Sequence, residues 1–182
     1  GAEILEDDTR RRILSRAKAP TAVWLDVHRE AHAVGLRTTA TMMFGVGEPF
    51  EARVDHLLGV RELQDDTGGF TAFIPWTFQD ESTDLEGEVV PSGGYDYLRT
   101  LAICRLVLDN VAHVQGSWVT QGAKIGELSL LFGADDLGSI MLEENVVAAA
   151  GAEHRMSQAD MERVIRAAGY IPRQRRTLYE PL

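Results

Sequence analysis

The sequence predicts an α/β fold in which an initial helix is followed by four parallel strand–helix units. Strands are expected to begin near positions 38, 70, 111 and 136, and a helical segment follows each of them. Strands that alternate with helices at this spacing form parallel sheets with right-handed crossovers. Four such units make either half of an eight-stranded barrel or a small open sheet, and the residues leave both alternatives open.

The central indication is the run Phe70–Ile74, which follows a Gly pair at the end of a helix. Both of its alternating sets are mostly apolar, as in a strand that is buried on both faces of a parallel sheet. Pro75 cannot donate to a sheet ladder, so we expect the strand to stop there. Trp76 and Gln79 then lie just past its carboxyl end, where α/β folds bind ligands. A core strand followed by an aromatic plug explains the same residues.

The segments before this strand carry boundary signals. Asp7–Ala17 is charged and compatible with a helix. A second helix is expected between Pro20, which suits a first helical turn, and Gly35, which suits a helix stop. Leu36–Phe44 is rich in Thr and apolar residues and predicts a strand. Glu51–Asp66 has apolar residues at helical spacing and predicts the helix before the central strand.

The rest of the chain continues the alternation. Asp80–Gly94 is a long polar loop, and a loop of this length inside a compact domain is usually functional or mobile. Ser157 opens a Ser-x-x-Asp variant of the capping box, which indicates a helix start. The other expected elements are a helix at Tyr95–Leu108, a strand at Val111–Val119, a helix at Ala123–Phe132, a strand at Asp136–Met141, helices at Glu143–Ala150 and Ser157–Ala168, and an irregular tail at Tyr170–Leu182.

Composition limits the classes of function. The formal charge of −10 argues against sequence-independent binding of nucleic acid. The single cysteine, Cys104, cannot by itself supply a disulfide, a Cys-rich zinc site or a thiolate-held iron–sulfur cluster. No apolar run reaches the length of a membrane span and no signal peptide opens the sequence, so we expect a cytoplasmic protein without a membrane partner.

Parallel strands place their carboxyl ends at one edge of the sheet, and polar and aromatic residues follow several of the expected strands. Acids, amides and two indoles at one rim would make a pocket for a small molecule. The residues expected at this rim are Gly45, Glu48, Trp76, Gln79, Ser117, Trp118, Gln121, Glu143, Glu144 and Asn145. Glu143 and Glu144 equally fit the first turn of a helix, where the helix dipole favours acidic side chains.

Histidines and a serine are the remaining candidates for chemistry. His28 and His32 stand four residues apart on a helix, but the order HREAH differs from the zinc-protease HExxH, so we interpret them as a solvated helix face. His56 is interpreted as a residue of a helix surface. Ser117 has no evident His and Asp partners, so a Ser-His-Asp hydrolase has little support. The residues alone assign no catalytic group and no metal ligand.

Seven segments together carry a resemblance that covers nearly the whole chain. They are GAEIL (1–5), TTATMMFG (38–45), the helix from Glu48 through Arg53, His56 and Leu57 to Arg61, QDDTGGFTAFIPWTFQ (64–79), YLRTLAICRLVLDN (97–110), SWVTQG (117–122) and FGADDLGSIMLEENVVAAAG (132–151). The chain resembles the radical S-adenosylmethionine enzymes that cyclise dehypoxanthine futalosine on the futalosine route to menaquinone. Aminofutalosine synthase and the FO synthase subunit of coenzyme F420 biosynthesis are related families, and IPWTFQ and SWVTQG favour the cyclising enzyme over them.

The chain departs from this family in one defining motif. The family holds a [4Fe–4S] cluster on the thiolates of a CxxxCxxC motif, which is absent here. By the resemblance, the chain begins just after the fourth strand of an eight-stranded TIM-type barrel. It would then be the C-terminal half, strands five to eight, in a single domain at 1–182 with an extension from about residue 152.

The resemblance also implies partners. The full-length enzyme would use S-adenosylmethionine and the [4Fe–4S] cluster on dehypoxanthine futalosine, whereas this chain alone would bind neither and be inactive. We expect this half to supply substrate contacts, with Glu3 as a contact to the cofactor. Because strands five and eight would lack their barrel neighbours, we also expect a homodimer of the chain. The alternatives are a non-catalytic half-barrel assembly module and an enzyme like aminofutalosine synthase or FO synthase.

Overall fold

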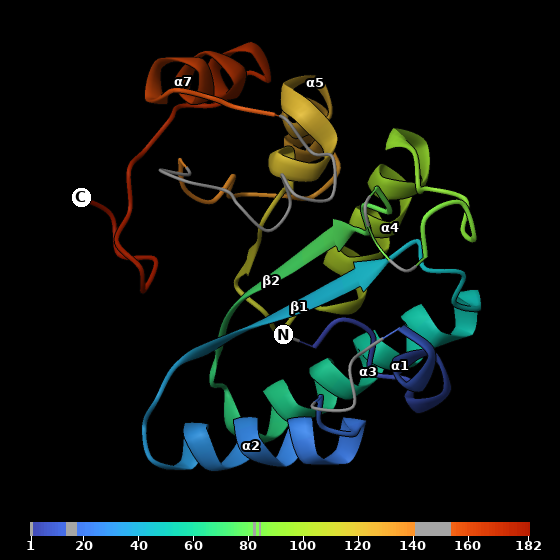
Figure 1. Ribbon diagram of the computed structural model, residues 1–182. Helices are drawn as coiled ribbons and strands as arrows, with labels where there is room; N and C mark the ends of the chain where they lie inside the picture. Colours follow the sequence, from blue (N-terminus) through green and yellow to red (C-terminus); the bar gives the residue numbers. More distant parts are fainter. Residues whose placement is uncertain (1, 14–17, 82, 84, 141–153) are drawn as a thin grey trace.

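The computed structural model describes residues 2–13, 18–81, 83, 85–140 and 154–182 (Figure 1). Within these ranges a three-stranded parallel sheet has the order β1-β2-β3 and is accompanied by helices. The strands are β1 Thr38–Phe44, β2 Phe70–Thr77 and β3 His113–Val114; the helices are α1 Asp7–Ile13, α2 Thr21–Ala33, α3 Phe50–Thr67, α4 Gly94–Val107, α5 Trp118–Leu131 and α7 Gln158–Ala167. The expected α/β class with parallel strands is confirmed.

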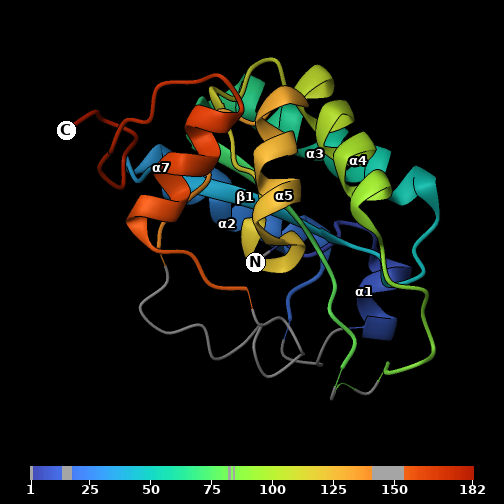
Figure 2. The same ribbon diagram turned by 90° about the horizontal axis from the view of Figure 1, so that it is seen from above.

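The helices follow one another around the sheet in chain order. α2 contacts α3, α3 contacts α4, α4 contacts α5, and α5 contacts α7. Figure 2 shows α7, α5 and α4 as neighbours above the sheet. Phe44 and Phe73, on the helix side, are completely buried, whereas Thr41, Ile74 and Trp76 alternate with them and are half-buried. One face of the sheet is therefore the helix-covered core, and the other is the more open face.

β2 continues through Pro75, so the expectation that it stops there is wrong. Phe78 N donates to Phe44 O, and Gln115 N donates to Phe73 O. Even-numbered residues of β2 thus direct their main-chain groups to β1, and odd-numbered residues direct theirs toward β3. Pro75 therefore faces the β3 side, where the ladder pairs only Ala72 and Phe73 of β2, so its missing N–H removes no hydrogen bond from that ladder and the proline is tolerated.

The third and fourth expected strands are much shorter than Val111–Val119 and Asp136–Met141. β3 has two residues, and the next segment contributes one parallel bridge, between Gln115 and Asp136, among the residues described up to 140. A side chain at Gly116 would meet Ser129, because a Cβ there would lie 2.2 Å from Ser129 Oγ. The chain then turns at Ser117 into α5, so within the described ranges the expected four strands correspond to three strands and a bridge.

The helices agree better with their expected ranges. Gly122 has φ 79° and ψ 170°, a conformation that is open only to glycine, and it divides α5 so that the regular part follows it, as expected for Ala123–Phe132. The capping box is confirmed, since Asp160 N donates to Ser157 Oγ and Ser157 N donates to Asp160 Oδ2. The expected helix Glu143–Ala150 lies outside the described residues. No helix in the described ranges has the length and hydropathy needed to cross a membrane.

Histidines that were interpreted as surface residues are packed instead. His28 and His32 are half-buried, and both hydrogen-bond the Thr38 hydroxyl, at 3.0 and 2.7 Å. The His32 ring lies edge-on to Phe70, with 4.9 Å between the ring centroids, because α2 covers the point where β1 and β2 begin. His56 is completely buried in α3. Helical periodicity alone did not show that these helix faces point inward.

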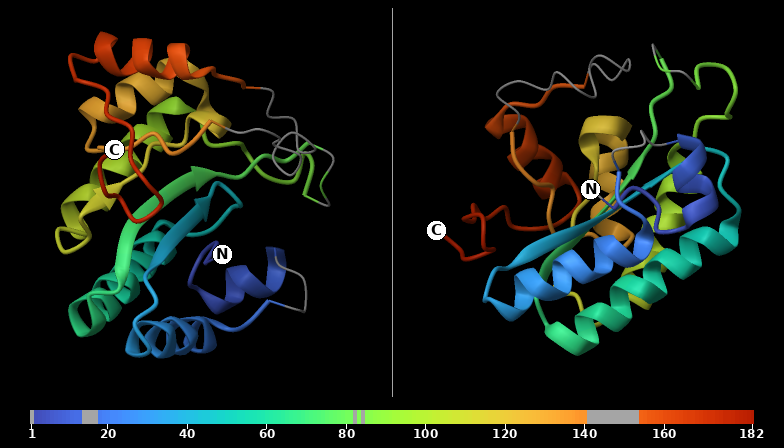
Figure 3. Two further views of the ribbon diagram at one scale, coloured as in Figure 1. Left: turned by 90° about the vertical axis from the view of Figure 1, so that its left-hand side faces the viewer. Right: turned by 60° about the horizontal axis from the view of Figure 1, so that its bottom comes forward.

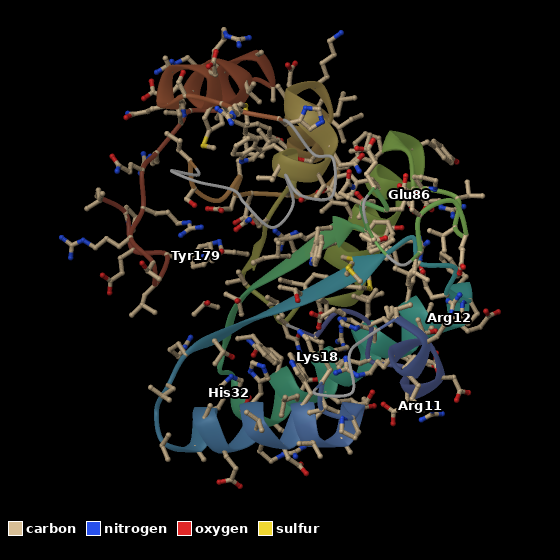
Figure 4. The ribbon with its side chains drawn as sticks, viewed as in Figure 1. Arg11, Arg12, Lys18, His32, Glu86 and Tyr179 are labelled. Atoms are coloured by element: carbon tan, nitrogen blue, oxygen red, sulfur yellow. The ribbon has the colours of Figure 1, made fainter. Side chains whose placement is uncertain are left out.

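The tail lies toward the end of the sheet at which the strands begin (Figure 3; Tyr179 and His32 are labelled in Figure 4). Arg175 donates to both carboxylate oxygens of Asp136 and lies over the Tyr179 ring at 3.8 Å. The Tyr179 ring also stacks on His113, with ring centroids 4.3 Å apart. The tail therefore carries its own contacts to β3 and to the Asp136 bridge.

Candidate functional site

Two amide side chains meet at the carboxyl end of β2. Gln121, from the first turn of α5, donates to Thr77 Oγ1 at 2.6 Å. Gln79 donates to the same oxygen at 3.2 Å and to the Thr77 main-chain oxygen, also at 3.2 Å. Thr77 is completely buried, so it is a fixed anchor. Both glutamines were expected at this rim, and the structure brings them together there.

Trp76, Ser117 and Trp118 line one cavity, of about 1350 Å³, that extends to α7 and the tail. Trp118 is only 2% exposed, so its indole forms part of the core wall. Trp76 is half-buried and is on the open face of the sheet, paired with Met43 of β1. Of the two indoles, Trp76 is the one that a bound molecule could cover.

Ser117 belongs to a network of hydroxyl groups. Its N–H donates to Tyr97 Oη at 2.6 Å, and its Oγ lies 2.9 Å from the Thr120 hydroxyl. Tyr97 is buried in α4, and burial raises the pKa of its phenol well above the ordinary value. The network is therefore neutral at pH 7 and suits hydrogen bonding to a polar molecule better than proton transfer.

Glu48, also expected at the rim, is fully engaged in holding the loop after β1. Its buried carboxylate accepts from Gly45 N at 3.0 Å, from Val46 N at 2.8 Å and from Arg53 Nε at 2.7 Å. Arg53 also pairs with Asp96 of α4 at 3.0 Å. Burial acts to raise the pKa of Asp96, but the hydrogen bonds that it accepts, the strongest from Arg53, bring that pKa below its ordinary value. Glu48 is thus a structural anion beside the site.

Glu3, the candidate cofactor contact, lies beside β1 and not on the sheet. Its main-chain oxygen accepts from Met43 N at 2.8 Å, one residue before the end of the strand. Its carboxylate pairs with Lys18 at 2.8 Å, and Lys18 is labelled in Figure 4. The Glu3 side chain is 13% exposed. Glu3 therefore approaches the same end of the sheet as the amide pair, from the β1 side.

The remaining expected contacts, Glu143, Glu144 and Asn145, lie outside the described residues. An iron–sulfur cluster does not fit the donor set of this chain, because Cys104 is the single cysteine and is completely buried in α4. Burial raises the pKa of the Cys104 thiol well above its ordinary value, which disfavours the thiolate that binds iron. Across the described ranges, no three His, Cys, Asp or Glu side chains are grouped to hold a metal ion.

Sequence reasoning missed Thr77 and Tyr97, the residues on which the rim side chains converge. Thr77 stands between Trp76 and Phe78 in PWTFQ, and its place between the expected rim residues Trp76 and Gln79 was the available signal. Tyr97 has the spacing of an apolar helix residue, so nothing in the pattern separated its hydroxyl from the core. The partner of Ser117 was therefore not foreseen.

Comparison with known proteins places this geometry in a family. A family model described as the CofH/MqnC C-terminal region matches residues 67–182. The cyclic dehypoxanthine futalosine synthase of Streptomyces coelicolor is 50% identical over 182 residues, which are 100% of this chain and 45% of that protein. The synthase of the same name from Halalkalibacterium halodurans is 48% identical over 99% of this chain and 48% of its own length.

A relative with a different name is also similar. The aminodeoxyfutalosine synthase of Thermus thermophilus is 41% identical over 98% of this chain and 49% of its own length. The chain thus spans about half the length of the curated relatives it matches. The resemblance drawn from the seven sequence segments is confirmed.

Proposed function

Because the chain belongs to the CofH/MqnC family, we propose that it is the substrate-facing C-terminal half of a radical S-adenosylmethionine enzyme that cyclises dehypoxanthine futalosine. The observation that carries this proposal is the 50% identity, over the whole chain, to a cyclic dehypoxanthine futalosine synthase. The identity to an aminodeoxyfutalosine synthase is 41%. The higher identity favours the cyclising reaction over the related one.

The side chains at the carboxyl rim of the sheet match the chemical groups of this substrate. Trp76 is half-buried on the open face, where its indole can lie against the benzoate ring of the substrate. Gln79, Gln121 and the hydroxyl network at Ser117 provide neutral hydrogen-bonding groups for the sugar. We assign substrate contacts to Trp76, Gln79, Ser117, Trp118 and Gln121, and extend the assignment to Glu143, Glu144 and Asn145 by their place in the sequence.

The cluster chemistry is assigned to the part of the enzyme outside this chain. S-adenosylmethionine, when bound, supplies the radical that removes a hydrogen atom from the substrate ribose. Glu3 offers that cofactor a carboxylate oxygen from the β1 side. This chain by itself is then inactive, and an anaerobic iron–sulfur reconstitution of it should give no 5′-deoxyadenosine.

A homodimer of the isolated chain remains part of the proposal. The open face presents Ile74 and Trp76 half-buried, which is less apolar surface than an open half-barrel would leave. Glu3 also occupies part of the free edge of β1. Light scattering on the isolated chain should nevertheless give about twice the 20.1 kDa chain mass. A monodisperse monomer would show that these contacts already satisfy the edges.

Turnover by the full gene product tests the function. After anaerobic reconstitution, S-adenosylmethionine and dehypoxanthine futalosine should yield 5′-deoxyadenosine and a spirocyclic product, both detected by mass spectrometry. Omitting dehypoxanthine futalosine should abolish the spirocyclic product. Turnover of the substrate of an aminodeoxyfutalosine synthase, without turnover of dehypoxanthine futalosine, would contradict the proposal and select the related enzyme.

A further inference from the structure

A short strap, Ala2–Leu5, runs along the free edge of β1 and is fixed at almost every peptide group. Ala2, Ile4 and Leu5 are buried, at 1%, 0% and 6% exposure. Between them Glu3 has φ 49°, in the left-handed region that a residue with a side chain rarely adopts. Such a conformation persists where the surroundings over-determine it, and it concentrates at ligand sites. The strap is held in this conformation by side chains that hydrogen-bond its peptide groups.

His56 is the first of these groups. Leu5 N donates to its Nδ1 at 3.0 Å, so Nδ1 carries no proton and the neutral ring has its proton on Nε2. Burial, and then the nearby charge of Arg10, lower the pKa of His56 to about 3. The ring is thus a permanent acceptor near neutral pH, and it ties the strap to α3 from inside the core.

Arg10 is the second group. Arg10 is only 5% exposed, and its guanidinium donates to the main-chain oxygens of Ala2 and of Ile4, the latter at 3.0 Å. It also donates to Ala19 O at 2.6 Å. Burying a cation is unfavourable unless it is paired and hydrogen-bonded, and here the three carbonyl oxygens and the nearby charges of Glu3 and Asp7 offset that cost. Arg10 in this way fixes the strap together with the residue that follows Lys18, the ion-pair partner of Glu3.

We propose that His56 and Arg10 are positioning residues that hold Glu3 ready to accept hydrogen bonds from the hydroxyl or ammonium groups of a nucleoside cofactor. The inference rests on the proposed function, in which Glu3 contacts S-adenosylmethionine. A strap that only covered β1 would favour glycine at a left-handed position, not a residue with a carboxylate. Because the carboxylate is already largely removed from water, hydrogen bonds that it accepts from a ligand are strengthened.

The test compares substitutions on one helix of the full gene product. His56→Leu removes the acceptor of Leu5 N, whereas His56→Asn keeps an oxygen near the place of Nδ1. Gln64→Leu is the matched control, because Gln64 also lies in α3 and is buried, but it binds Phe70, accepting from its N at 2.8 Å and donating to its O at 3.1 Å. Three quantities are measured for each variant: thermal midpoint, exchange rate of the Leu5 amide, and affinity for S-adenosylhomocysteine, a non-reacting probe.

We expect His56→Leu and Gln64→Leu to lower the thermal midpoint similarly. Only His56→Leu should lower the affinity for S-adenosylhomocysteine, by about tenfold or more, and increase the exchange rate of the Leu5 amide. His56→Asn should restore both the affinity for S-adenosylhomocysteine and the slow exchange of the Leu5 amide. Faster exchange with unchanged affinity would overturn the inference, and so would unchanged exchange. If His56→Leu does not fold, Thr41→Val takes its place, because Thr41 Oγ1 accepts from Ala2 N at 3.3 Å; unchanged affinity there would overturn the inference equally.

Glu3→Gln separates this inference from the proposed function. If Glu3→Gln leaves the affinity for the probe unchanged, the assigned cofactor contact is wrong, whatever His56 does. If Glu3→Gln lowers the affinity for the probe but His56→Leu and Thr41→Val do not, Glu3 contacts the cofactor as proposed. The positioning role of His56 and Arg10 is then wrong.

Discussion

The two edges of the sheet are built by different means. At the β1 edge, buried side chains of His56 and Arg10 hold the Ala2–Leu5 strap through its peptide groups. At the β3 edge, one bridge to Asp136 is supported from outside by the partly exposed Arg175. Buried hydrogen bonds define position closely because leaving one unmade is costly, whereas exposed ion pairs contribute little. The β1 edge thus fixes geometry, and the β3 edge adds modest support.

The largest effect is expected at the loop after β1. Arg53→Leu leaves the buried Glu48 carboxylate without its cation and should lower the free energy of unfolding by about 3–5 kcal/mol. Arg99→Leu is the control, because Arg99 pairs with the same Asp96 but is half exposed, and its loss should cost about 1 kcal/mol or less. Urea unfolding measures both. Equal losses would mean that the β1 side is not held by buried charge.

The second effect is a pH dependence that comes from His56. Unfolded His56 takes up a proton below about pH 6.5, whereas the folded residue stays neutral until about pH 3, so the unfolded state binds more protons in between. Between pH 6 and 4 the wild type should therefore lose stability relative to His56→Asn by about 1.4 kcal/mol per pH unit as pH falls. Urea unfolding at several pH values checks this slope. A pH-independent difference would show that His56 is not a buried neutral acceptor.

A smaller effect is expected at the β3 edge. Arg175→Ala removes the paired hydrogen bonds to Asp136, which are partly exposed, and should lower the free energy of unfolding by about 1–2 kcal/mol. Arg176→Ala is the neighbouring control, because its side chain is exposed, and it should change stability by less than about 0.5 kcal/mol. Thermal unfolding compares the two variants. A loss in the range expected for Arg53→Leu would make the two edges equivalent.

The same contrast separates what the sequence could predict from what it could not. β1, β2 and α3 have apolar runs with clear periods; the ranges of β1 and α3 and the start of β2 were predicted closely, whereas β2 runs three residues past its predicted end. The segment after Val114 has a strand-like composition, but Gly116 packs against Ser129 and the chain turns at Ser117, a tertiary constraint that no local pattern contains. His56 was misplaced for the same reason, since its partner Leu5 is 51 residues away in sequence.

At the candidate site, the residues at strand ends were predictable because parallel strands share one rim. Gln79 and Gln121 could be named from the sequence, but their convergence on Thr77 could not, because it depends on where α5 begins. Trp76 and Trp118 were predicted as a pair, yet one is accessible and the other is part of the core wall. Burial, which depends on the whole fold, separates the two indoles.

Binding of dehypoxanthine futalosine to Trp76→Ala and Tyr179→Ala variants of the full gene product tests the central claim, that the carboxyl rim of the sheet is the substrate face. Both side chains are half-buried aromatics, one at this rim and one where the strands begin. Trp76→Ala should weaken binding by about tenfold or more, and Tyr179→Ala by less than about twofold, with similar losses of thermal midpoint. Unchanged affinity in folded Trp76→Ala, with a lowered midpoint, would make Trp76 a core residue and contradict the account.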